Sequence, residues 1–337
     1  MIIVLNRVKV YTSTFIGGLK IKKVDLAIIG AGPVGLFAAH FAHLHGLSSL
    51  IFDSLSEVGG QPQMLYPFKK ISDIPAYNSI NGTALIQNLK SGLPKETEII
   101  TNHKVNDIKK NADGFVLDNV VLAKSIIIAT GAGAFKPKEL PLKMRDEIQK
   151  RVHYFIKDPK DFANQKIGVF GGGNSALDLA IELANYANVK IIHRRNEFRG
   201  LELNVKKLRS LTNVEILTPY LPKDIQLINN QLDITLKGMG DVQSRHEQFD
   251  QIVVAYGFKA NNRFIKNWGI ELNGTNIAVD PTMKTNIDGI YAAGDVVNYP
   301  GRVPLIALGF GEAQIAITSI MRDLFPEKTL TIHSTSI

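Results

Sequence analysis

The chain of 337 residues is long enough for about two domains, and 45% hydrophobic content is sufficient for buried cores. It contains no cysteine, which excludes structural disulfides, thiolate metal sites, iron–sulfur ligation and a dithiol redox centre on this chain. Lysine and arginine number 39 against 31 aspartate and glutamate, a formal net charge of +8, which favours an acidic partner. No block of five basic residues and no basic-aromatic alternation occurs. General surface charge is therefore the first interpretation, an acidic protein partner the second and nucleic acid the last.

Residues 1–23 alternate weakly between apolar and polar positions and end in lysines, before the first core strand begins. We expect them to form an extension outside the domains. Because residues 1–22 lack a clear signal-peptide cleavage site, we expect a cytoplasmic protein.

The stretch that ends at Asp53 predicts a strand, a glycine turn, a helix and a second strand. Gly30, Gly32 and Gly35 have the spacing G-x-G-x-x-G directly after an apolar run. We expect Gly30 to permit the turn, Gly32 to let a pyrophosphate approach bare backbone, and Gly35 to bring the helix close to the strand. The phosphates would meet free N–H groups at the positive end of the helix. Asp53 could then accept hydrogen bonds from an unmodified adenosine ribose.

Two other interpretations of this stretch are less favoured. No Asp, Glu, Lys or Arg occurs between Leu26 and Phe52, but a membrane-spanning helix needs about 20 apolar residues, and glycines and a proline interrupt this run. We therefore expect no membrane span. The histidines at 40, 43 and 45 could indicate a metal site, but we expect solvated side chains near a helix end and no metal.

The segment after Asp53 is rich in glycine and proline, with Gly59, Gly60, Pro62 and Pro67, and predicts an irregular loop that lines a site. Further along, the pattern predicts a helix over 83–90, a pair of strands over 99–108 and a short buried strand over 124–130.

A second strand, glycine turn, helix and strand follow from residue 166. The turn reads G-G-G-N-S-A, and its candidate binding residues are Gly171, Gly173 and Asn174. Where the first unit has an acid, the second has basic residues: His193, Arg194, Arg195 and then Arg199. Such a cluster suits a 2′-phosphate, because the planar guanidinium binds phosphate oxygens in pairs. The alternative is a solvated basic strand end.

One site for a plain adenosine ribose and one for a 2′-phosphate suggest that FAD and NADPH are held by separate domains, with hydride transfer between them. Strands over 214–217, 232–236 and 251–255 fit the rest of the second domain. The chain then returns to a short strand that ends in Gly294 and Asp295, followed by a helix over 313–324. Asp295 could cap a turn, but we favour a ligand role beside the flavin.

At these residues the sequence resembles the thioredoxin-reductase-like ferredoxin–NADP+ reductases, a branch of the flavoproteins with two dinucleotide-binding domains. The resemblance covers nearly everything after residue 23. It rests on these motifs: G-A-G-P-V-G (30–35), G-G-Q (59–61), L-Y-P (65–67), A-T-G-A (129–132), G-G-G-N-S-A (171–176), H-R-R-N-E-F-R (193–199), A-A-G-D (292–295) and H-S-T-S (333–336). Thioredoxin reductases share most of them but carry a C-x-x-C, which this chain lacks.

The resemblance implies a set of FAD contacts: Asp53, Gln61, Tyr66, Val105, Phe135, Asp295 and Thr335. It implies that Tyr66 stacks on one face of the flavin and that His333 covers the other, from the partner subunit of a homodimer. Asp53 stands where relatives often have the longer Glu.

We therefore expect an α/β protein with two Rossmann-like three-layer domains. The FAD domain would be discontinuous, 24–137 with 263–325, with an NADP domain inserted at 138–262 and a tail at 326–337 over the flavin. Electrons would pass between NADPH and ferredoxin through FAD, with no catalytic side chain. The alternatives are an NAD(P)H oxidase or a quinone or flavodoxin reductase on the same scaffold, and a redox-sensing flavoprotein that does not turn over.

Overall fold

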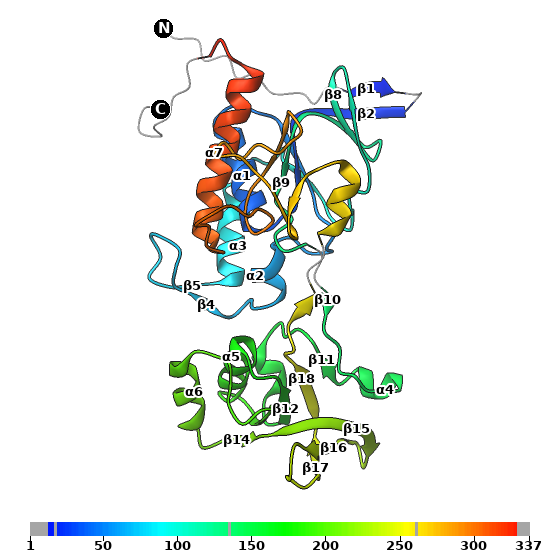
Figure 1. The fold of residues 1–337 in the computed structure, drawn as a ribbon, viewed down its shortest axis with the longest axis vertical. Coiled ribbons are helices and arrows are strands. Elements are labelled where there is room, and N and C mark those ends of the chain that lie inside the picture. The colour runs from blue at the N-terminus through cyan, green and yellow to red at the C-terminus, as the bar shows by residue number, and fades with distance from the viewer. Residues whose placement is uncertain (1–12, 17–18, 134–135, 260–261, 329–337) are drawn as a thin grey trace. The chain divides into compact units, whose positions relative to one another are not determined.

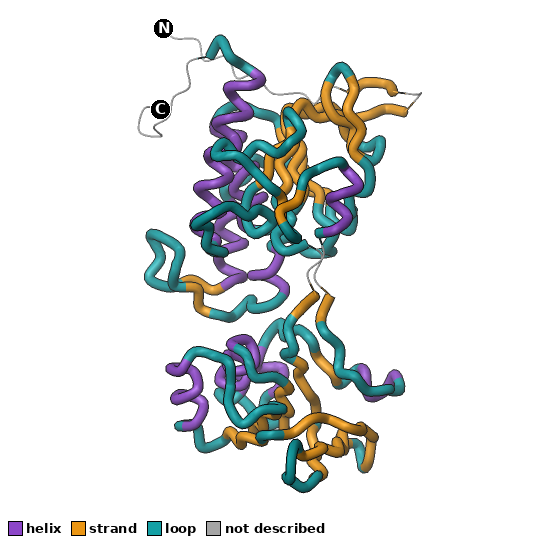
Figure 2. Tube along the Cα trace, in the orientation of Figure 1, coloured by secondary structure: helices purple, strands orange, loops and turns teal. Residues whose placement is uncertain are grey.

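The computed structural model describes residues 13–16, 19–133, 136–259 and 262–328 (Figure 1). Contacts divide the chain into two compact units, the first of residues 1–134 with 260–337 and the second of residues 135–259. Each unit contains a parallel sheet with helices packed on it, as the tube in Figure 2 shows. The chain therefore has the predicted α/β class, with one unit inserted into the other.

The first unit is a mixed α/β layer structure. Its strands are β1 (Ser13–Ile16), β2 (Leu19–Ile29), β3 (Ser49–Phe52), β4 (Lys70–Ile71), β5 (Ile80–Asn81), β6 (Glu98–Ile100), β7 (Ile108–Asn111), β8 (Gly114–Leu117), β9 (Val121–Ile128), β20 (Leu272–Asn273), β21 (Asn276–Ile277) and β22 (Ile290–Ala292). Its helices are α1 (Pro33–Leu44), α2 (Gly60–Met64), α3 (Gly82–Ser91), the 3-10 helix η2 (Arg263–Trp268) and α7 (Ile306–Leu324).

The main sheet of the first unit is organised around β2. Parallel pairing joins β6, β3, β2, β9 and β22, so the carboxyl ends of these strands share one edge. The register places Ile29, the last residue of β2, beside Phe52 of β3 and Ile128 of β9. The antiparallel strands β7 and β8 extend the sheet from the first half of β9.

Alternating side chains of β2 enter two separate cores, as a strand buried on both faces requires. Leu26 and Ile28 pack into the core formed with α1 and α7. Ala27 and Ile29 pack into the core on the other face, which includes Trp268 of η2. Helix α1 also contacts both α7 and α3 (Figure 1). The result is the three-layer arrangement expected for a dinucleotide-binding domain.

The second unit repeats the plan on a smaller scale. Its elements are β10 (Lys136–Pro137), α4 (Asp146–Gln149), β11 (Val152–His153), the 3-10 helix η1 (Pro159–Phe162), β12 (Lys166–Phe170), α5 (Asn174–Leu183), β13 (Asn188–Ile192), α6 (Glu202–Arg209), β14 (Val214–Leu217), β15 (Tyr220–Ile228), β16 (Gln231–Gly238), β17 (Arg245–Phe249), β18 (Gln251–Val254) and β19 (Phe258–Lys259). The parallel sheet has the order β11-β18-β12-β13-β14.

Different elements cover the two faces of this second sheet. Helix α5 packs on β12 and β13. The antiparallel sheet β15-β16-β17 shares a buried core with the parallel sheet, in which Phe170 and Val254 meet Leu232 and Phe249. Both faces of the parallel strands are therefore buried, which explains their nearly continuous apolar sequences.

Four local predictions need correction. The segment predicted as an irregular loop contains α2, because Pro62 lies in the first turn of a helix, where its missing N–H costs no helical hydrogen bond. The segment 101–107 is a loop between β6 and β7, and the Asp118 carboxylate accepts hydrogen bonds from its amides. Helix α7 begins at Ile306 rather than Ala313, and β2 begins well before Leu26.

Among the residues described, no helix is both long and apolar enough to cross a membrane.

Candidate functional site

The glycine turn of the first unit joins β2 to α1 at the carboxyl edge of the sheet. Gly30 has φ +113°, and its N–H donates to the carbonyl of Phe52 at 2.7 Å. A Cβ added at Gly30 would overlap the carbonyl oxygen of Ala129, and one added at Gly35 would overlap the carbonyl of Gly30. Both positions therefore require glycine for steric reasons within the protein itself.

Gly32 differs from the other two glycines, because a Cβ added there would meet nothing within 4 Å. It is the N-cap of α1, and no side chain accepts a hydrogen bond from the first helical amides. The second glycine pair lies close by: Gly59 N–H donates to the carbonyl of Ala31 at 2.9 Å, and a Cβ on Gly60 would lie 3.1 Å from Cα of Gly32. This open turn, with unpaired amides at a helix start, suits an anion such as a pyrophosphate.

Asp53 ends β3 beside this turn and is 7% exposed. Its Oδ2 accepts a hydrogen bond from the Ala31 amide at 2.6 Å, and its Oδ1 accepts one from the Leu55 amide at 2.8 Å. Burial raises the pKa of the Asp53 carboxyl, although these two amides act in the opposite direction. Asp53 therefore supports the glycine turn, and each oxygen still has a lone pair for a further donor.

Two buried polar atoms have no hydrogen-bond partner among the described residues: Oγ1 of Thr130, just after β9, and Oδ1 of Asn262. Asn262 is 5% exposed, and its Nδ2 donates to the carbonyl of Gly131 at 3.1 Å. Nε2 of Gln61 lies 3.9 Å from where a Cβ of Gly131 would be. Because buried polar atoms are normally paired, these positions indicate a place where a ligand would complete the hydrogen bonds.

Tyr66 lies close enough to Asp295 for the charge of the carboxylate to act on the tyrosine hydroxyl. Burial, with the charges of Asp295 and Asp73, raises the pKa of the Tyr66 hydroxyl to about 12. Tyr66 packs on a small apolar cluster that includes Ile306 and Phe310 of α7. The ring is therefore a neutral, partly buried surface beside an exposed carboxylate.

Of the remaining predicted FAD contacts, the structure describes only Val105. Val105 is 2% exposed and its side chain packs in the core with Phe52, so only its main chain could meet a ligand. Phe135, His333 and Thr335 lie outside the described residues.

The glycine turn of the second unit has the same division of roles. Gly171 has φ +157°, and a Cβ there would lie 2.6 Å from the carbonyl oxygen of Ala255. Gly173 is the N-cap of α5 without a side-chain cap, and a Cβ there would meet nothing within 4 Å. Asn174 accepts a hydrogen bond from the Leu201 amide at 2.7 Å through Oδ1, which holds the following loop against the turn.

His193 ends β13 with its ring packed so closely on Gly172 that a Cβ there would overlap it. Phe198 stacks on the ring, with centroids 5.7 Å apart. Burial lowers the pKa of His193, and the charges of Arg195, Arg194 and Arg199 lower it further. Its Nε2 is buried and has no hydrogen-bond partner among the described residues.

Three arginines surround this histidine. Arg194, Arg195 and Arg199 are exposed, and none forms an ion pair or side-chain hydrogen bond within the part of the chain that the structure describes. The Arg199 amide donates to the carbonyl of Gly172 at 2.7 Å, which ties this loop to the glycine turn. Their positive charge is therefore available to an anion beside α5.

Sequence reasoning missed Tyr256, which follows β18 at the same edge. Burial raises the pKa of its hydroxyl to about 12, against the nearby charge of Arg194. It also missed Thr130 and Asn262, although Thr130 lies within the A-T-G-A motif. A polar residue directly after a buried parallel strand was the available signal for Thr130.

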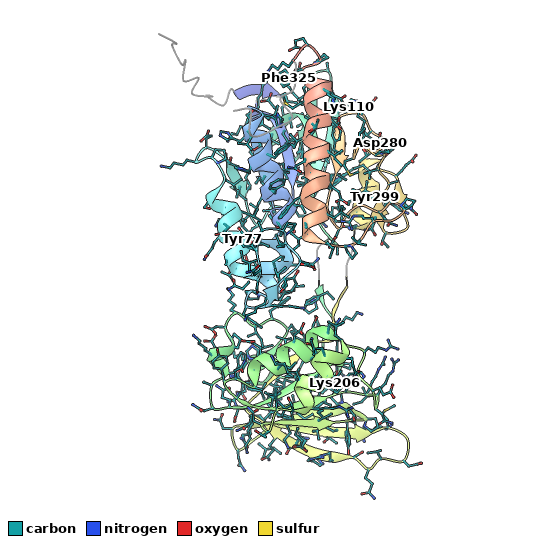
Figure 3. The ribbon with its side chains drawn as sticks, turned by 90° about the vertical axis from the view of Figure 1, so that its left-hand side faces the viewer. Tyr77, Lys110, Lys206, Asp280, Tyr299 and Phe325 are labelled. Atoms are coloured by element: carbon teal, nitrogen blue, oxygen red, sulfur yellow. The ribbon has the colours of Figure 1, made fainter. Side chains whose placement is uncertain are left out.

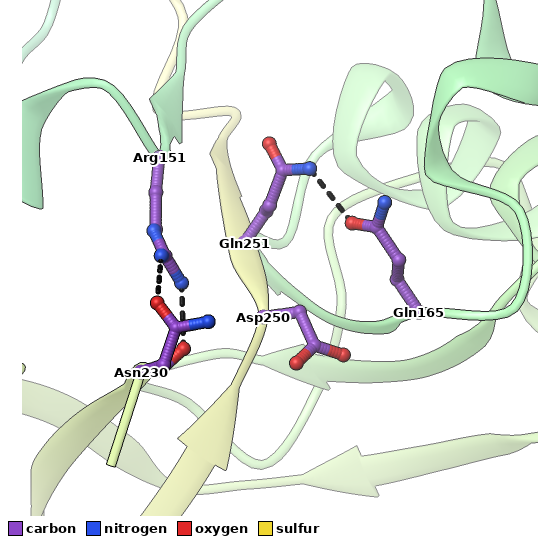
Figure 4. Close-up of a pocket in the computed structure, with 5 residues that line it drawn as sticks. All are labelled: Arg151, Gln165, Asn230, Asp250 and Gln251. Carbon is purple, nitrogen blue, oxygen red and sulfur yellow. Dashed lines mark hydrogen bonds between the residues drawn. The ribbon is translucent and has the colours of Figure 1, made fainter. Parts of the chain in front are cut away.

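An open pocket of about 410 Å³ lies elsewhere on the second unit (Figure 4). It is lined by Arg151, Gln165, Asn230, Asp250 and Gln251. Arg151, Gln165 and Gln251 lie at the starts of β11, β12 and β18, so the pocket is at the amino edge of the sheet. Asn230 is in the β15–β16 turn. Arg151 donates to both the carbonyl and the side-chain oxygen of Asn230, and Gln251 donates to Gln165. This pocket is therefore not the glycine-turn site.

Residues 24–317 match the family model described as pyridine nucleotide-disulphide oxidoreductase. The chain belongs to this family. The match spans both glycine turns and the turn at Asp295, which agrees with the resemblance expected from the motifs.

Relatives in this family include proteins named ferredoxin–NADP reductase. One from Lactobacillus helveticus (strain DPC 4571) is 99% identical over 310 residues, which cover 92% of this chain and 100% of the relative. Another from Streptococcus sanguinis (strain SK36) is 41% identical over 321 residues, 93% of this chain and 98% of the relative.

Solved structures of the same fold include thioredoxin reductases. That of T. acidophilum superposes with a TM-score of 0.74 at 26% identity, over 90% of this chain and 99% of that one. That of Lactococcus lactis (FR conformation) superposes with a TM-score of 0.71 at 26% identity, over 89% of this chain and 98% of that one. The present sequence has no cysteine, so it supplies no dithiol of its own to this scaffold.

Proposed function

We propose that the protein is a ferredoxin–NADP+ reductase that uses FAD and NADPH. FAD would be held by residues 24–137 with 263–325, NADPH by residues 138–262, and the tail 326–337 would cover the flavin. The names of the relatives at 99% and 41% identity support this activity.

One observation supports the cofactors most directly. Within the described residues, the buried side-chain polar atoms without a partner are Oγ of Thr130, Oδ1 of Asn262 and Nε2 of His193. Thr130 lies beside Gly30, Asn262 is hydrogen-bonded to Gly131, and His193 packs on Gly172. A bound dinucleotide would supply the missing partners at these positions. The open positions at Gly32 and Gly173 leave room for a pyrophosphate at each turn. The residues present therefore fit two dinucleotides.

In the first unit we assign the FAD contacts to Gly30, Gly32, Gly35, Asp53, Gln61, Tyr66, Val105, Phe135, Asp295, His333 and Thr335. Asp53 would accept from a ribose hydroxyl while it holds the Ala31 amide. Tyr66 would present its neutral ring to the flavin. Asp295 would accept a hydrogen bond from the flavin.

In the second unit we assign the NADPH contacts to Gly171, Gly173, Asn174, His193, Arg194, Arg195 and Arg199. The three unpaired guanidiniums suit a 2′-phosphate, for which charge-assisted, paired hydrogen bonds are the strongest available contacts. Because its pKa is lowered, His193 would act through its neutral ring, with Nε2 as acceptor for a ribose hydroxyl.

A bound flavin would supply the redox chemistry, in which a hydride from NADPH is passed on as two single electrons to two ferredoxins and one proton is released. The protein needs no catalytic acid, base or nucleophile for this exchange. Its residues bind the two cofactors, orient them and limit the access of water. Because NADPH and ferredoxin are found inside cells, we propose a cytoplasmic enzyme, and we propose a homodimer in which the tail reaches the partner.

The purified protein is expected to contain FAD, released intact on denaturation, and to be reduced by NADPH without oxygen. Added ferredoxin should then restore the oxidised flavin spectrum, over repeated cycles with fresh NADPH. The measurement is the flavin absorbance during anaerobic titration, followed by stopped-flow mixing with oxidised ferredoxin.

The other outcomes of this experiment identify the alternatives. Reoxidation by oxygen or a quinone but not by ferredoxin would favour an oxidase or quinone reductase. Reduction without turnover by any acceptor would favour a redox sensor. Recovery of FMN, or of no flavin from well-folded protein, would remove the basis of the assignment.

Ferredoxin reduction is expected to slow as salt concentration rises, because the chain is basic and ferredoxins are acidic. Charges on a surface are screened over about 10 Å at 0.1 M salt. The measurement is the apparent association rate with ferredoxin at saturating NADPH, which removes the salt dependence of nucleotide binding. Reduction of a small neutral quinone is the control and should change much less. An association rate that does not respond to salt would argue against a basic docking surface.

A further inference from the structure

A buried ion pair lies behind the turn that carries Asp295. Glu312, on α7, is 1% exposed and the side chain of Arg302 is 5% exposed. Oε1 of Glu312 accepts hydrogen bonds from Nε of Arg302 at 2.8 Å and from the Tyr299 hydroxyl at 2.9 Å. Oε2 accepts from the Gly294 amide at 2.7 Å. Glu312 thus connects the loop before α7 (Tyr299, labelled in Figure 3) to the residue that precedes Asp295.

Arg302 extends this connection to the Asp295 side chain itself. Its Nη2 lies 3.2 Å from Oδ1 of Asp295, whose side chain is 42% exposed. The other carboxylate oxygen, Oδ2, forms no hydrogen bond or ion pair within the described residues. The arginine therefore holds one oxygen of Asp295 in place, and the second oxygen keeps its capacity to accept a hydrogen bond.

The stability of the fold does not by itself account for this pair. Charges buried together lose much of their hydration, and well-packed apolar residues often replace such pairs without loss of stability. A buried pair whose free end reaches a partly exposed carboxylate is instead suited to setting the position of that carboxylate.

We propose that Arg302 and Glu312 are positioning residues for flavin binding. Glu312 orients Arg302, and Arg302 fixes the Asp295 carboxylate so that Oδ2 faces a hydrogen-bond donor of the flavin. This inference rests on the proposed function. Both residues would act through Asp295 and not by touching the flavin themselves.

The test measures the dissociation constant of FAD by dilution of the holoenzyme and recovery of flavin fluorescence. Arg302→Met is expected to weaken FAD binding about tenfold or more, the size of one lost charge-assisted contact. Arg302→Lys should recover part of this loss, since an ammonium can still reach Asp295. Because Arg302→Met leaves Glu312 buried and unpaired, the double variant Arg302→Met/Glu312→Gln, which removes both charges, is measured beside it.

A double-mutant cycle separates positioning from general stability. If Arg302 acts through Asp295, Arg302→Met should add almost nothing to the loss in an Asp295→Ala background. The matched control is Arg245→Met/Glu247→Gln, which removes an arginine from a buried glutamate of the second unit. This control should leave FAD affinity unchanged whatever it does to the melting temperature.

Wild-type affinity for FAD in Arg302→Met/Glu312→Gln, or additive losses in the cycle, would overturn the inference while leaving the proposed function intact. A wild-type protein that holds no FAD would instead contradict the proposed function.

Discussion

Replacement of Arg194 and Arg195 by alanine is expected to raise the Michaelis constant for NADPH at least about 100-fold. Each charge-assisted contact contributes roughly 1.5–3 kcal/mol, and about 1.4 kcal/mol corresponds to a factor of ten. NADH lacks the 2′-phosphate, so its Michaelis constant should change little. The measurement is steady-state reduction of a small acceptor with each nucleotide.

The matched control removes two exposed basic residues of the same unit that lie outside the glycine turn. Lys206 and Arg209 on α6 fulfil this condition (Lys206 is labelled in Figure 3). Lys206→Ala/Arg209→Ala lowers the net charge equally and should leave the preference for NADPH unchanged. An equal rise in the Michaelis constants for NADPH and NADH in the Arg194/Arg195 variant would contradict the assignment of these arginines to the 2′-phosphate.

Replacement of Gly32 by alanine is expected to weaken FAD binding while the protein stays folded. A Cβ at this position meets nothing within 4 Å in the protein, so the fold should accept it. The methyl group would occupy the space through which the pyrophosphate approaches. Overpacking by such a group typically costs about 1–3 kcal/mol, or roughly five- to 150-fold in affinity. FAD titration and thermal unfolding of the apoprotein measure the two effects separately.

Two other glycines provide the comparison. Gly35→Ala should lower the free energy of unfolding, because its Cβ would overlap the carbonyl of Gly30. A Cβ added at Gly311, in α7, would meet nothing within 4 Å. Gly311→Ala should therefore neither destabilise the protein nor weaken FAD binding. A Gly32→Ala protein with wild-type affinity for FAD would show that the flavin does not approach this turn.

The two strand–turn–helix–strand units could be predicted from sequence because their signals are local. An apolar run, a glycine spacing and the residue that ends the next strand lie within about 30 residues. The start of α7 could not be predicted, because Gly309 and Gly311 weaken the helical pattern. The structure explains Gly309 by a contact distant in sequence, since a Cβ there would lie 2.5 Å from Val34 of α1.

Site residues could be predicted where they stand at a fixed spacing from a motif. They could not be predicted where their role depends on a contact between residues distant in the sequence. Asp53 follows from the first unit's spacing, but its hydrogen bond to Ala31 depends on how β2 and β3 lie side by side. The unpaired Oδ1 of Asn262 depends on a return of the chain to Gly131. Nothing near Arg302 in the sequence indicates that it would bridge Glu312 and Asp295.

The pairing of β2 on both sides has a consequence for how the chain can vary. Both faces of β2 are buried. A shift of its pairing by one residue would therefore exchange the side chains that enter the two cores. The same shift would carry Gly30 away from Phe52 and Ala129, the neighbours that demand a glycine. An inserted or deleted residue within 26–29 would thus damage both cores and the cofactor turn at once. Length changes in this protein should accumulate in its surface loops, while β2 can change only by substitution.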